Sequence, residues 1–317
     1  MISLAADRVD DVLHDCLKAL VAEGDRIHPS RGEAIEVRGA RLELTNPRAR
    51  LSRSHTRGKA FSCLGELVWY LAGSGSADQI AFYLPKYRDD AESDGTIHAA
   101  YGTRLFARDG RLQAVIDTLR AKRDTRQAVV QLLDAGDLAS GYRHVPCTCT
   151  LQFMWRGDLL DLVVFMRSND AYLGLPHDIF SFTMLQELVA RTVGAELGTY
   201  IHMVGSLHMY ERDRAATQRF LGEGFAALRP MPPMPGGDPW EAVEKLVESE
   251  ATLRAGDVKE PDSVGHPYWD DLFRLLNAFA LWKLGGHDER IAAIRESMHD
   301  DVYDVFFADR FDASGGY

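Results

Sequence analysis

Two cysteines lie two residues apart in the segment Pro146-Cys147-Thr148-Cys149. A cysteine thiolate is a strong nucleophile and a metal ligand, although buried cysteines often only fill a core. A zinc site of the base-deaminase type needs Pro-Cys-x-x-Cys after an upstream His-x-Glu. Here the cysteines are one residue too close, and the only His-x-Glu begins downstream at His287. We therefore expect no metal and consider a nucleophilic thiol.

A carboxylate stands in an otherwise apolar segment, where Glu66 has Leu64, Leu67 and Trp69 as neighbours. The spacing of apolar residues predicts a helix over residues 59–72 that ends at Gly73. Glu66 lies either on the solvent-facing side of this helix or inside the protein. A buried carboxylate is costly unless it has partners, and such a group can move protons in catalysis. The pattern alone leaves both interpretations open.

Several short motifs follow one another along the chain and share no repeat. They are Ser30-Arg31-Gly32, Gly65-Glu66-Leu67, Ala100-Tyr101-Gly102, Asp124-Thr125-Arg126-Gln127, Pro146-Cys147, Arg167-Ser168-Asn169-Asp170, Gly174-Leu175-Pro176-His177-Asp178 and Gly205-Ser206-Leu207-His208-Met209-Tyr210. Over roughly residues 25–215 this series resembles the thymidylate synthase family. The resemblance implies an α/β (α+β) fold in which helices cover a mixed β-sheet. It also implies folate-dependent transfer of a one-carbon unit to C5 of a pyrimidine nucleotide.

The resemblance assigns roles to the residues that match the family's motifs. Cys147 would attack C6 of the pyrimidine and so make C5 nucleophilic. Glu66 would move protons at the ring, and Tyr101 belongs to the same catalytic group. The other matches concern ligand binding. Arg31, Arg167 and Ser168 would bind the phosphate, and Arg126 would bind the phosphate held by a neighbouring subunit. His208 and Tyr210 would bind the sugar 3′-hydroxyl, and Asp170 would contact the folate pterin. We expect the nearby arginines to favour the Cys147 thiolate.

One position departs from thymidylate synthases, which have Asn where this chain has Asp178. An ionised carboxylate accepts two hydrogen bonds, which suits the amino group and the protonated N3 of cytosine. Uracil would set its O4 against an acceptor. Asp178 resembles the cytidylate 5-hydroxymethylase branch of the family, and its alternative role is a helix cap. We therefore expect the chain to use 5,10-methylenetetrahydrofolate and water to make a 5-hydroxymethyl nucleotide from CMP or dCMP.

Other departures agree with a reaction that admits water. Thr148 and Met166 replace a His and a Gln that the family usually has, and residues 81–96 lack its tryptophans. The alternatives are a thymidylate synthase that makes dTMP from dUMP, a binding-only relative, and an S-adenosylmethionine-dependent cytosine methylase. The last would need a Gly-rich loop after a strand, which we do not find. A ribose substrate would indicate nucleoside-antibiotic synthesis, which the Ala-, Arg- and Asp-rich composition favours over modified DNA precursors.

The elements that must position these residues can be predicted from periodicity and turn residues. We expect helices over residues 6–23 and from Pro176 to about residue 193, a hairpin at 33–44 around Gly39, and strands at 126–133, 149–156, 159–167 and 199–208. A Pro-rich loop over residues 229–239 leads to a helical tail over 240–300, with helices at 240–254, 268–284 and 287–299. We expect the tail to lie against the body, so that residues 1–317 form a single catalytic domain.

Composition limits the classes of function. Of 317 residues, 46% are hydrophobic and 26% are charged, which is typical of a globular protein. The net charge of −11 argues against nucleic acid as a partner, because binding there depends on neutralising phosphates. No apolar run is long enough to cross a membrane, and the first residues lack a secretion signal. Four cysteines fit free thiols in the cytoplasm. The expected partners are a pyrimidine nucleoside monophosphate and a second copy of the chain in a homodimer.

Overall fold

A seven-stranded mixed sheet forms the centre of the protein in a computed structural model, which describes residues 1–56, 58–107, 110–139, 141–224, 227–258, 265–286 and 288–312. The strands are β1 (Ile2–Ala6), β2 (Asp25–Ile27), β3 (Ala34–Leu44), β4 (Val129–Gln131), β5 (Thr148–Arg156), β6 (Leu159–Asp170) and β7 (Glu196–Tyr210). Their order is β1-β3-β7-β6-β5-β4, with β2 also paired to β3. The β1–β3 and β6–β7 pairs are parallel, and the others are antiparallel. This confirms the predicted mixed α/β fold.

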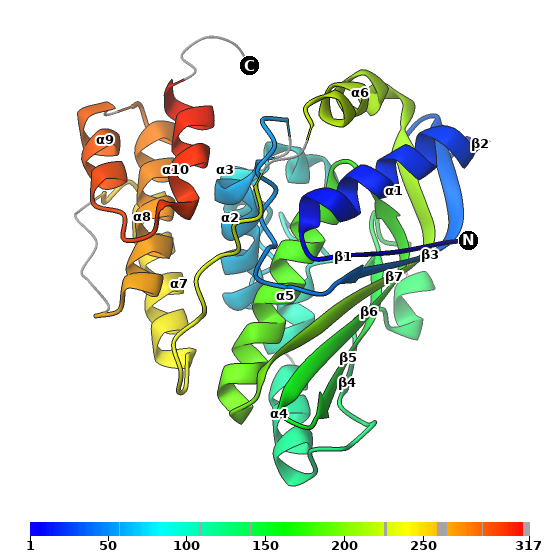
Figure 1. Cartoon of the computed structure of the whole chain (residues 1–317), viewed down its shortest axis with the longest axis horizontal. Coiled ribbons are helices and arrows are strands. Elements are labelled where there is room, and N and C mark those ends of the chain that lie inside the picture. Colours follow the sequence, from blue (N-terminus) through cyan, green and yellow to red (C-terminus); the bar gives the residue numbers. More distant parts are fainter. Residues whose placement is uncertain are drawn as a thin grey trace.

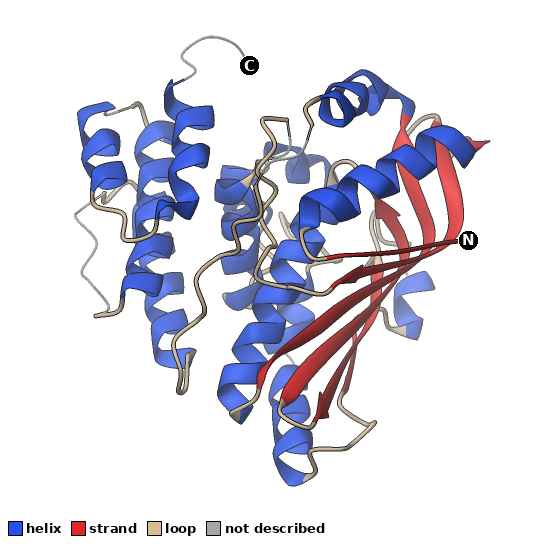
Figure 2. Cartoon of the chain, in the orientation of Figure 1, coloured by secondary structure: helices blue, strands red, loops and turns tan. Residues whose placement is uncertain are grey.

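The α-helices gather mainly on one side of this sheet (Figures 1 and 2). They are α1 (Val9–Glu23), α2 (Ala60–Leu71), α3 (Ala77–Tyr83), α4 (Arg111–Ala121), α5 (Gly174–Val193), α6 (Arg214–Gly222), α7 (Trp240–Arg254), α8 (Pro267–Lys283), α9 (Asp288–Glu296) and α10 (Asp304–Phe307). One hydrophobic core joins the inner faces of these helices to the covered face of the sheet. None of the helices in the described ranges is long and apolar enough to span a membrane.

The structure corrects three local predictions. The expected hairpin at 33–44 is wrong, because β3 runs through Gly39 as one strand. The φ of +74° at Gly39 fits a local irregularity where the edge partner changes from β2 to β1. The helix expected from residue 6 begins at Val9 because β1 comes first, and the strand expected at 126–133 is limited to β4. Helix α5 begins at Gly174, so Pro176 lies in its first turn.

The strands predicted at 149–156, 159–167 and 199–208 are confirmed as β5, β6 and β7. Because β6 and β7 are parallel, their carboxyl ends lie side by side, with Asp170 paired to His208. Helix α2 packs against α5, which follows β6 in the chain. Gly65 allows the close contact of α2 with α3, since a Cβ there would lie 2.2 Å from the Tyr83 ring.

The segment after α6 crosses the body before the chain enters its helical tail (Figure 1). The backbone N–H groups of Met231 and Met234 bond to the Arg48 carbonyl and to Glu187, which fixes this Pro-rich connection. The predicted tail helices are confirmed as α7, α8 and α9, although His287 lies outside the described residues. They contact α2 and α3: Tyr83, for example, stacks on Phe279 of α8 at 5.0 Å.

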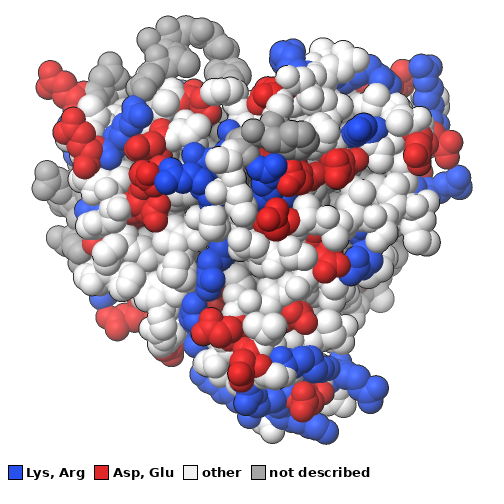
Figure 3. Space-filling model, viewed as in Figure 1, with Lys and Arg blue, Asp and Glu red and all other residues white. Residues whose placement is uncertain are grey.

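Charged side chains are unevenly distributed on the face seen in Figure 3, where Lys and Arg gather over the end of the molecule that holds α4. Two arginines of this region are ion-paired: Arg111 with Asp134 at 3.0 Å and Arg123 with Asp158 at 3.3 Å. Part of this positive charge is therefore neutralised within the chain.

Candidate active site

The carboxyl ends of β6 and β7 bring together most of the residues that the sequence singles out. Arg167 and Ser168 lie near the end of β6, and His208 and Tyr210 lie at the end of β7. Cys147 comes just before β5, and its carbonyl accepts a hydrogen bond from the Arg167 N–H at 2.9 Å. The rings of His208 and Tyr210 are edge to face, with centroids 5.1 Å apart. Residues far apart in sequence thus form one cluster.

Cys147 is half-buried at the edge of this cluster. Its sulfur lies 3.7 Å from Nη2 of Arg167, whose guanidinium also donates to the carbonyls of Val145 and Pro146 at 3.0 Å. Burial raises the pKa of the Cys147 thiol, and the charges of Arg167 and Arg31 oppose this only in part. The arginines therefore favour the thiolate, as expected, but burial has the larger effect on the pKa of Cys147. Cys149 lies at a bulge in the β5–β6 pairing.

Glu66 is a buried carboxylate with two tyrosine partners. The hydroxyl groups of Tyr70 and Tyr87 donate to the same oxygen, Oε1, at 2.9 and 2.7 Å. Burial raises the pKa of Glu66, while the two hydrogen bonds lower it by less. The interpretation of Glu66 as a helix-surface residue is therefore wrong. A carboxyl group with a raised pKa suits the uptake and release of protons.

Asp178 lies on α5 and is buried near Glu66. Its Oδ2 accepts a hydrogen bond from Nδ2 of Asn169 at 2.7 Å. Burial and then the negative charge of Glu66 raise the pKa of Asp178 well above its ordinary value. The helix-cap interpretation is wrong, because α5 already begins at Gly174 and Asp178 bonds across to β6.

Tyr101 connects these groups to the segment that holds Cys147. Its hydroxyl oxygen accepts the N–H of Thr148 at 3.2 Å, and its ring lies 5.4 Å from the Tyr70 ring and 5.9 Å from the Phe182 ring. The negative charges of Asp178 and of the Cys147 thiolate contribute to raising the pKa of Tyr101, after the larger effect of burial. Tyr101 therefore lies between the thiol and the buried carboxyl groups.

Arg31 is the cation on the loop side of the cluster. It pairs with Asp90 at 2.7 Å and with the His144 ring at 3.0 Å, and its carbonyl accepts from Arg212 at 3.0 Å. Its charge and that of Arg167 both lower the pKa of His144, after the larger effect of burial. Arg31 and Arg167 thus act on one small region, which is suited to an anion.

Asp170 and Arg126, which the resemblance assigns to ligand binding, lie in other surroundings. Asp170 accepts the backbone N–H groups of Tyr172 and Leu173 at 2.9 and 3.0 Å and so forms the turn before α5. Arg126 precedes the edge strand β4, is exposed and lies outside the cluster formed by this chain's own residues.

Sequence reasoning missed four side chains that hold the buried carboxyl groups. Tyr70 and Tyr87 bind Glu66, Asn169 binds Asp178, and His202 binds Asn169. Tyr70 could have been found, because residues four apart on a helix lie on one face. The other contacts depend on how separate elements are brought together.

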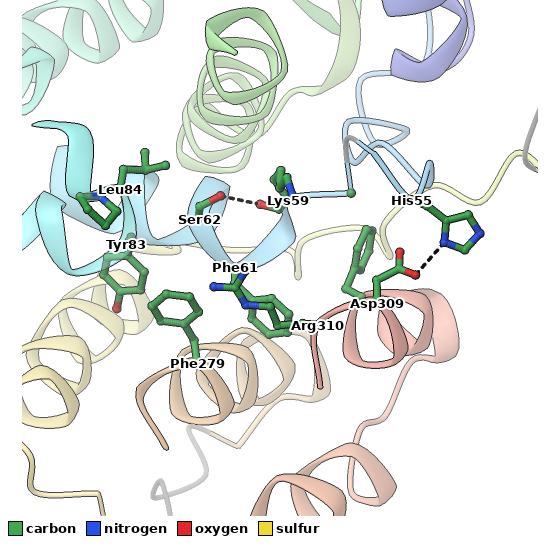
Figure 4. A pocket seen from close by; sticks show the side chains of 12 residues that line it. His55, Lys59, Phe61, Ser62, Tyr83, Leu84, Phe279, Asp309 and Arg310 are labelled. Atoms are coloured by element: carbon green, nitrogen blue, oxygen red, sulfur yellow. Dashed lines mark hydrogen bonds and ion pairs between the residues drawn. The ribbon is translucent and has the colours of Figure 1, made fainter. Parts of the chain in front are cut away.

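A cavity of about 280 Å³ lies between α2 and the tail helices (Figure 4). Phe61, Tyr83 and Phe279 form aromatic walls, and Lys59 and Arg310 contribute positive charge. Ser62 lines the cavity and also bonds to His177, the neighbour of Asp178, at 3.0 Å. Neither Cys147 nor the buried carboxyl groups line the cavity, but the bond from Ser62 to His177 connects its wall to the helix that carries Asp178. Within the described residues, no group of three or more His, Cys, Asp or Glu side chains is arranged to hold a metal ion.

Comparison with known proteins agrees with this arrangement. The chain is 31% identical over 194 residues to a deoxyuridylate hydroxymethyltransferase of Delftia phage PhiW-14, with 57% of this chain and 54% of that protein aligned. It is 28% identical over 233 residues to a deoxyuridylate hydroxymethyltransferase of Bacillus phage SP01, with 68% of this chain and 61% of that protein aligned. The chain therefore covers less than two thirds of the length of either relative. Residues 14–231 match the family model described as thymidylate synthase, and the chain belongs to the thymidylate synthase family.

Proposed function

We propose that the chain is a cytidylate 5-hydroxymethylase. It would transfer a one-carbon unit from 5,10-methylenetetrahydrofolate to C5 of CMP or dCMP and add water, releasing the 5-hydroxymethyl nucleotide and tetrahydrofolate. The observation that carries this proposal is the buried Asp178 beside Glu66, at the position where thymidylate synthases have Asn. The four cysteines are free, which supports a reducing compartment such as the cytoplasm.

The raised pKa of Asp178 favours a neutral carboxyl group, which has one O–H donor and acceptor oxygens. Such a group can donate to N3 of cytosine and accept from the amino group at C4. When Cys147 adds to C6, negative charge develops at N3, and Asp178 can deliver its proton there. The interaction therefore becomes stronger as the reaction proceeds, which is the condition for lowering the barrier. An amide at this position has no proton to deliver.

A neutral Asp178 would not reject uracil in the way expected of an ionised carboxylate. A neutral Asp178 can donate to O4 and accept from N3–H, so uracil does not meet acceptors only. The two relatives are named for deoxyuridylate, and this observation favours uridylate hydroxymethylation as the second candidate function. The identity of the base then depends on which oxygen of Asp178 carries the proton.

The remaining roles follow from the positions of the groups. Cys147 would form the bond to C6, and Arg167, 3.7 Å from its sulfur, would stabilise the thiolate. Glu66, held by Tyr70 and Tyr87, would accept the proton that leaves C5 through water, with Tyr101 ordering the nucleophile segment. We assign the phosphate to Arg31, Arg167 and Ser168, and the sugar hydroxyl to His208 and Tyr210.

The cavity between α2 and the tail helices supports a place for the folate. Its aromatic walls suit flat rings, and Lys59 and Arg310 suit the carboxylates of a glutamyl group, so the residues present fit this cosubstrate. When bound, the folate supplies a one-carbon unit at the oxidation level of formaldehyde. Asp170 is the proposed contact to the pterin.

A homodimer is part of the proposal, because the face of the sheet opposite the long helices carries exposed apolar side chains. Phe165 and Met203 are paired across β6 and β7 and are 42% and 40% exposed. Two such faces in contact would remove these side chains from water. The exposed Arg126 is then available for the phosphate at the partner's site.

The test is to incubate the protein with 5,10-methylenetetrahydrofolate and, separately, CMP, dCMP, UMP or dUMP, and to identify products by mass spectrometry. The proposal predicts a cytidylate product that is heavier than the substrate by one CH₂O unit. Whether CMP or dCMP is converted identifies the sugar that the enzyme accepts. A CH₂O product from uridylate alone would favour the second candidate. A CH₂ product, with dihydrofolate detected by absorbance, would instead indicate thymidylate synthase activity.

A further inference from the structure

Asp178 is the end of a hydrogen-bonded chain of four buried side chains. Nδ2 of Asn169 donates to Oδ2 of Asp178 at 2.7 Å, and Oδ1 of Asn169 lies 3.2 Å from Nε2 of His202. Nδ1 of His202 lies 2.6 Å from the Tyr200 hydroxyl. All four side chains are buried, and the proposed reaction assigns no role to the last three. Burying such a series of polar side chains is costly unless each hydrogen bond has one donor and one acceptor, so the donor and acceptor of each bond can be worked out.

The hydrogen bonds between these four side chains all run in one direction. Burial lowers the pKa of His202 to about 3, so the imidazole is neutral and has a single N–H. The carbonyl oxygen of Asn169 can only accept, so this N–H is on Nε2. Nδ1 is then an acceptor, and the Tyr200 hydroxyl donates to it. Every donor from Tyr200 to Asn169 therefore points toward Asp178.

This direction makes the two oxygens of Asp178 unequal. Oδ2 already accepts an N–H, so the proton of the neutral acid belongs on Oδ1. We propose that Asn169, held by His202 and Tyr200, is a specificity-determining positioning residue that keeps the proton of Asp178 on Oδ1 and thereby selects cytosine over uracil. The inference rests on the proposed function, because it concerns the base in the same site.

The selection follows from the edges of the two bases. Cytosine presents an acceptor at N3 beside a donor at C4, whereas uracil presents a donor at N3 beside an acceptor at C4. With the phosphate and sugar held, the proposal places Oδ1 of Asp178 opposite N3 and Oδ2 opposite the substituent at C4. An acid whose proton is fixed opposite N3 pairs with cytosine and sets donor against donor with uracil. If the proton could move to Oδ2, uracil would pair equally well.

The test compares kcat/KM for cytidylate and uridylate, in the sugar form that the wild type prefers, in Asn169→Leu, His202→Phe and Tyr200→Phe. Asn277→Leu is the matched control, since Asn277 is a buried amide on α8. We expect the cytidylate-to-uridylate ratio to fall about tenfold or more in Asn169→Leu, mainly through a gain with uridylate. The cytidylate-to-uridylate ratio should fall less in His202→Phe and least in Tyr200→Phe, because both variants keep the Asn169 amide. The control should keep the ratio of the wild type.

A second readout is the pKa of Asp178, followed by ¹³C NMR of its carboxyl carbon in the same variants. The Asn169 bond lowers this pKa, so Asn169→Leu should raise it. Equal losses with both bases in all three variants, with an unchanged Asp178 titration, would overturn the inference and leave Asn169 a structural residue. If the wild type converts uridylate but no cytidylate, the proposed function and the selection of cytosine both fail; if it converts cytidylate and Asn169→Leu keeps the wild-type ratio, the inference alone fails.

Discussion

Replacing Asp178 by Asn removes a proton that can be delivered to N3 and keeps the size of the side chain. The amide oxygen can still accept the hydrogen bond that Asn169 donates at 2.7 Å, so the local structure should be retained. The loss is one hydrogen bond that becomes charge-assisted as N3 is protonated, worth about 1.5–3 kcal/mol. At about 1.4 kcal/mol per factor of ten, kcat/KM for cytidylate should fall by roughly ten- to a hundredfold.

The assay is steady-state kinetics of the wild type and Asp178→Asn on cytidylate and uridylate. Because the bond strengthens along the reaction, the loss should appear in kcat and not only in KM. Uridylate conversion should stay near its wild-type level, because the amide that Asn169 holds again sets a donor opposite N3, so the cytidylate-to-uridylate ratio should fall through the loss with cytidylate. Glu250→Gln is the control: Glu250 is also buried, but it bonds Gln79 and Tyr83 away from the thiol. An unchanged cytidylate-to-uridylate ratio would refute the reasoning and return Asp178 to a structural role.

Three further predictions concern the thiol, the buried glutamate and the sheet. Alkylation of Cys147 by iodoacetamide should rise with pH through a midpoint above the ordinary thiol pKa, and Arg167→Ala should raise that midpoint further; a lower midpoint in Arg167→Ala would contradict the account. Because the pKa of Glu66 is raised on folding, the folded state binds more protons than the unfolded state above about pH 4.5, and stability falls as pH rises through this window. The free energy of unfolding of Glu66→Gln relative to the wild type, measured with urea, should therefore be higher at about pH 8 than at about pH 4.5. The gain should be about 1.4 kcal/mol for each unit by which folding raises the pKa. An equal difference at both pH values would contradict a buried carboxylate with a raised pKa. Phe165→Asp should turn a dimer into a monomer in sedimentation, whereas the same change at exposed Leu138, which is not on the sheet, should leave the dimer intact; a wild-type monomer with full activity would exclude the shared site.

The central sheet and the helices could be predicted because their signals are local. Apolar runs mark β5, β6 and β7, and helical spacing marks α2, α5, α7 and α8. The error at residues 33–44 has a physical cause: Gly39 is typical of a turn, but here it lies inside a strand whose edge partner changes. The five residues of β1 are too few for a periodicity to show.

The site could be predicted only as far as motifs identify single residues. The cluster of Cys147, Arg167 and His208 follows from the family resemblance and from the parallel pairing of β6 and β7. The sign of the Cys147 pKa could not be predicted, because desolvation depends on the packing of many side chains around the sulfur. The partners of Asp178 were missed for the same reason, since Asn169 and His202 lie on different strands and meet only in the sheet.

The central claim is that Cys147 forms a covalent bond to a cytidylate whose base Asp178 holds. It is tested most directly with a 5-fluorocytidylate, because fluorine at C5 cannot leave as the proton does and the bond to C6 should persist in the presence of methylenetetrahydrofolate. Intact-protein mass spectrometry and peptide mapping should find the nucleotide on Cys147 in the wild type and in Cys149→Ser, and no adduct in Cys147→Ser. An adduct on Cys149, or product formation by Cys147→Ser, would contradict the account.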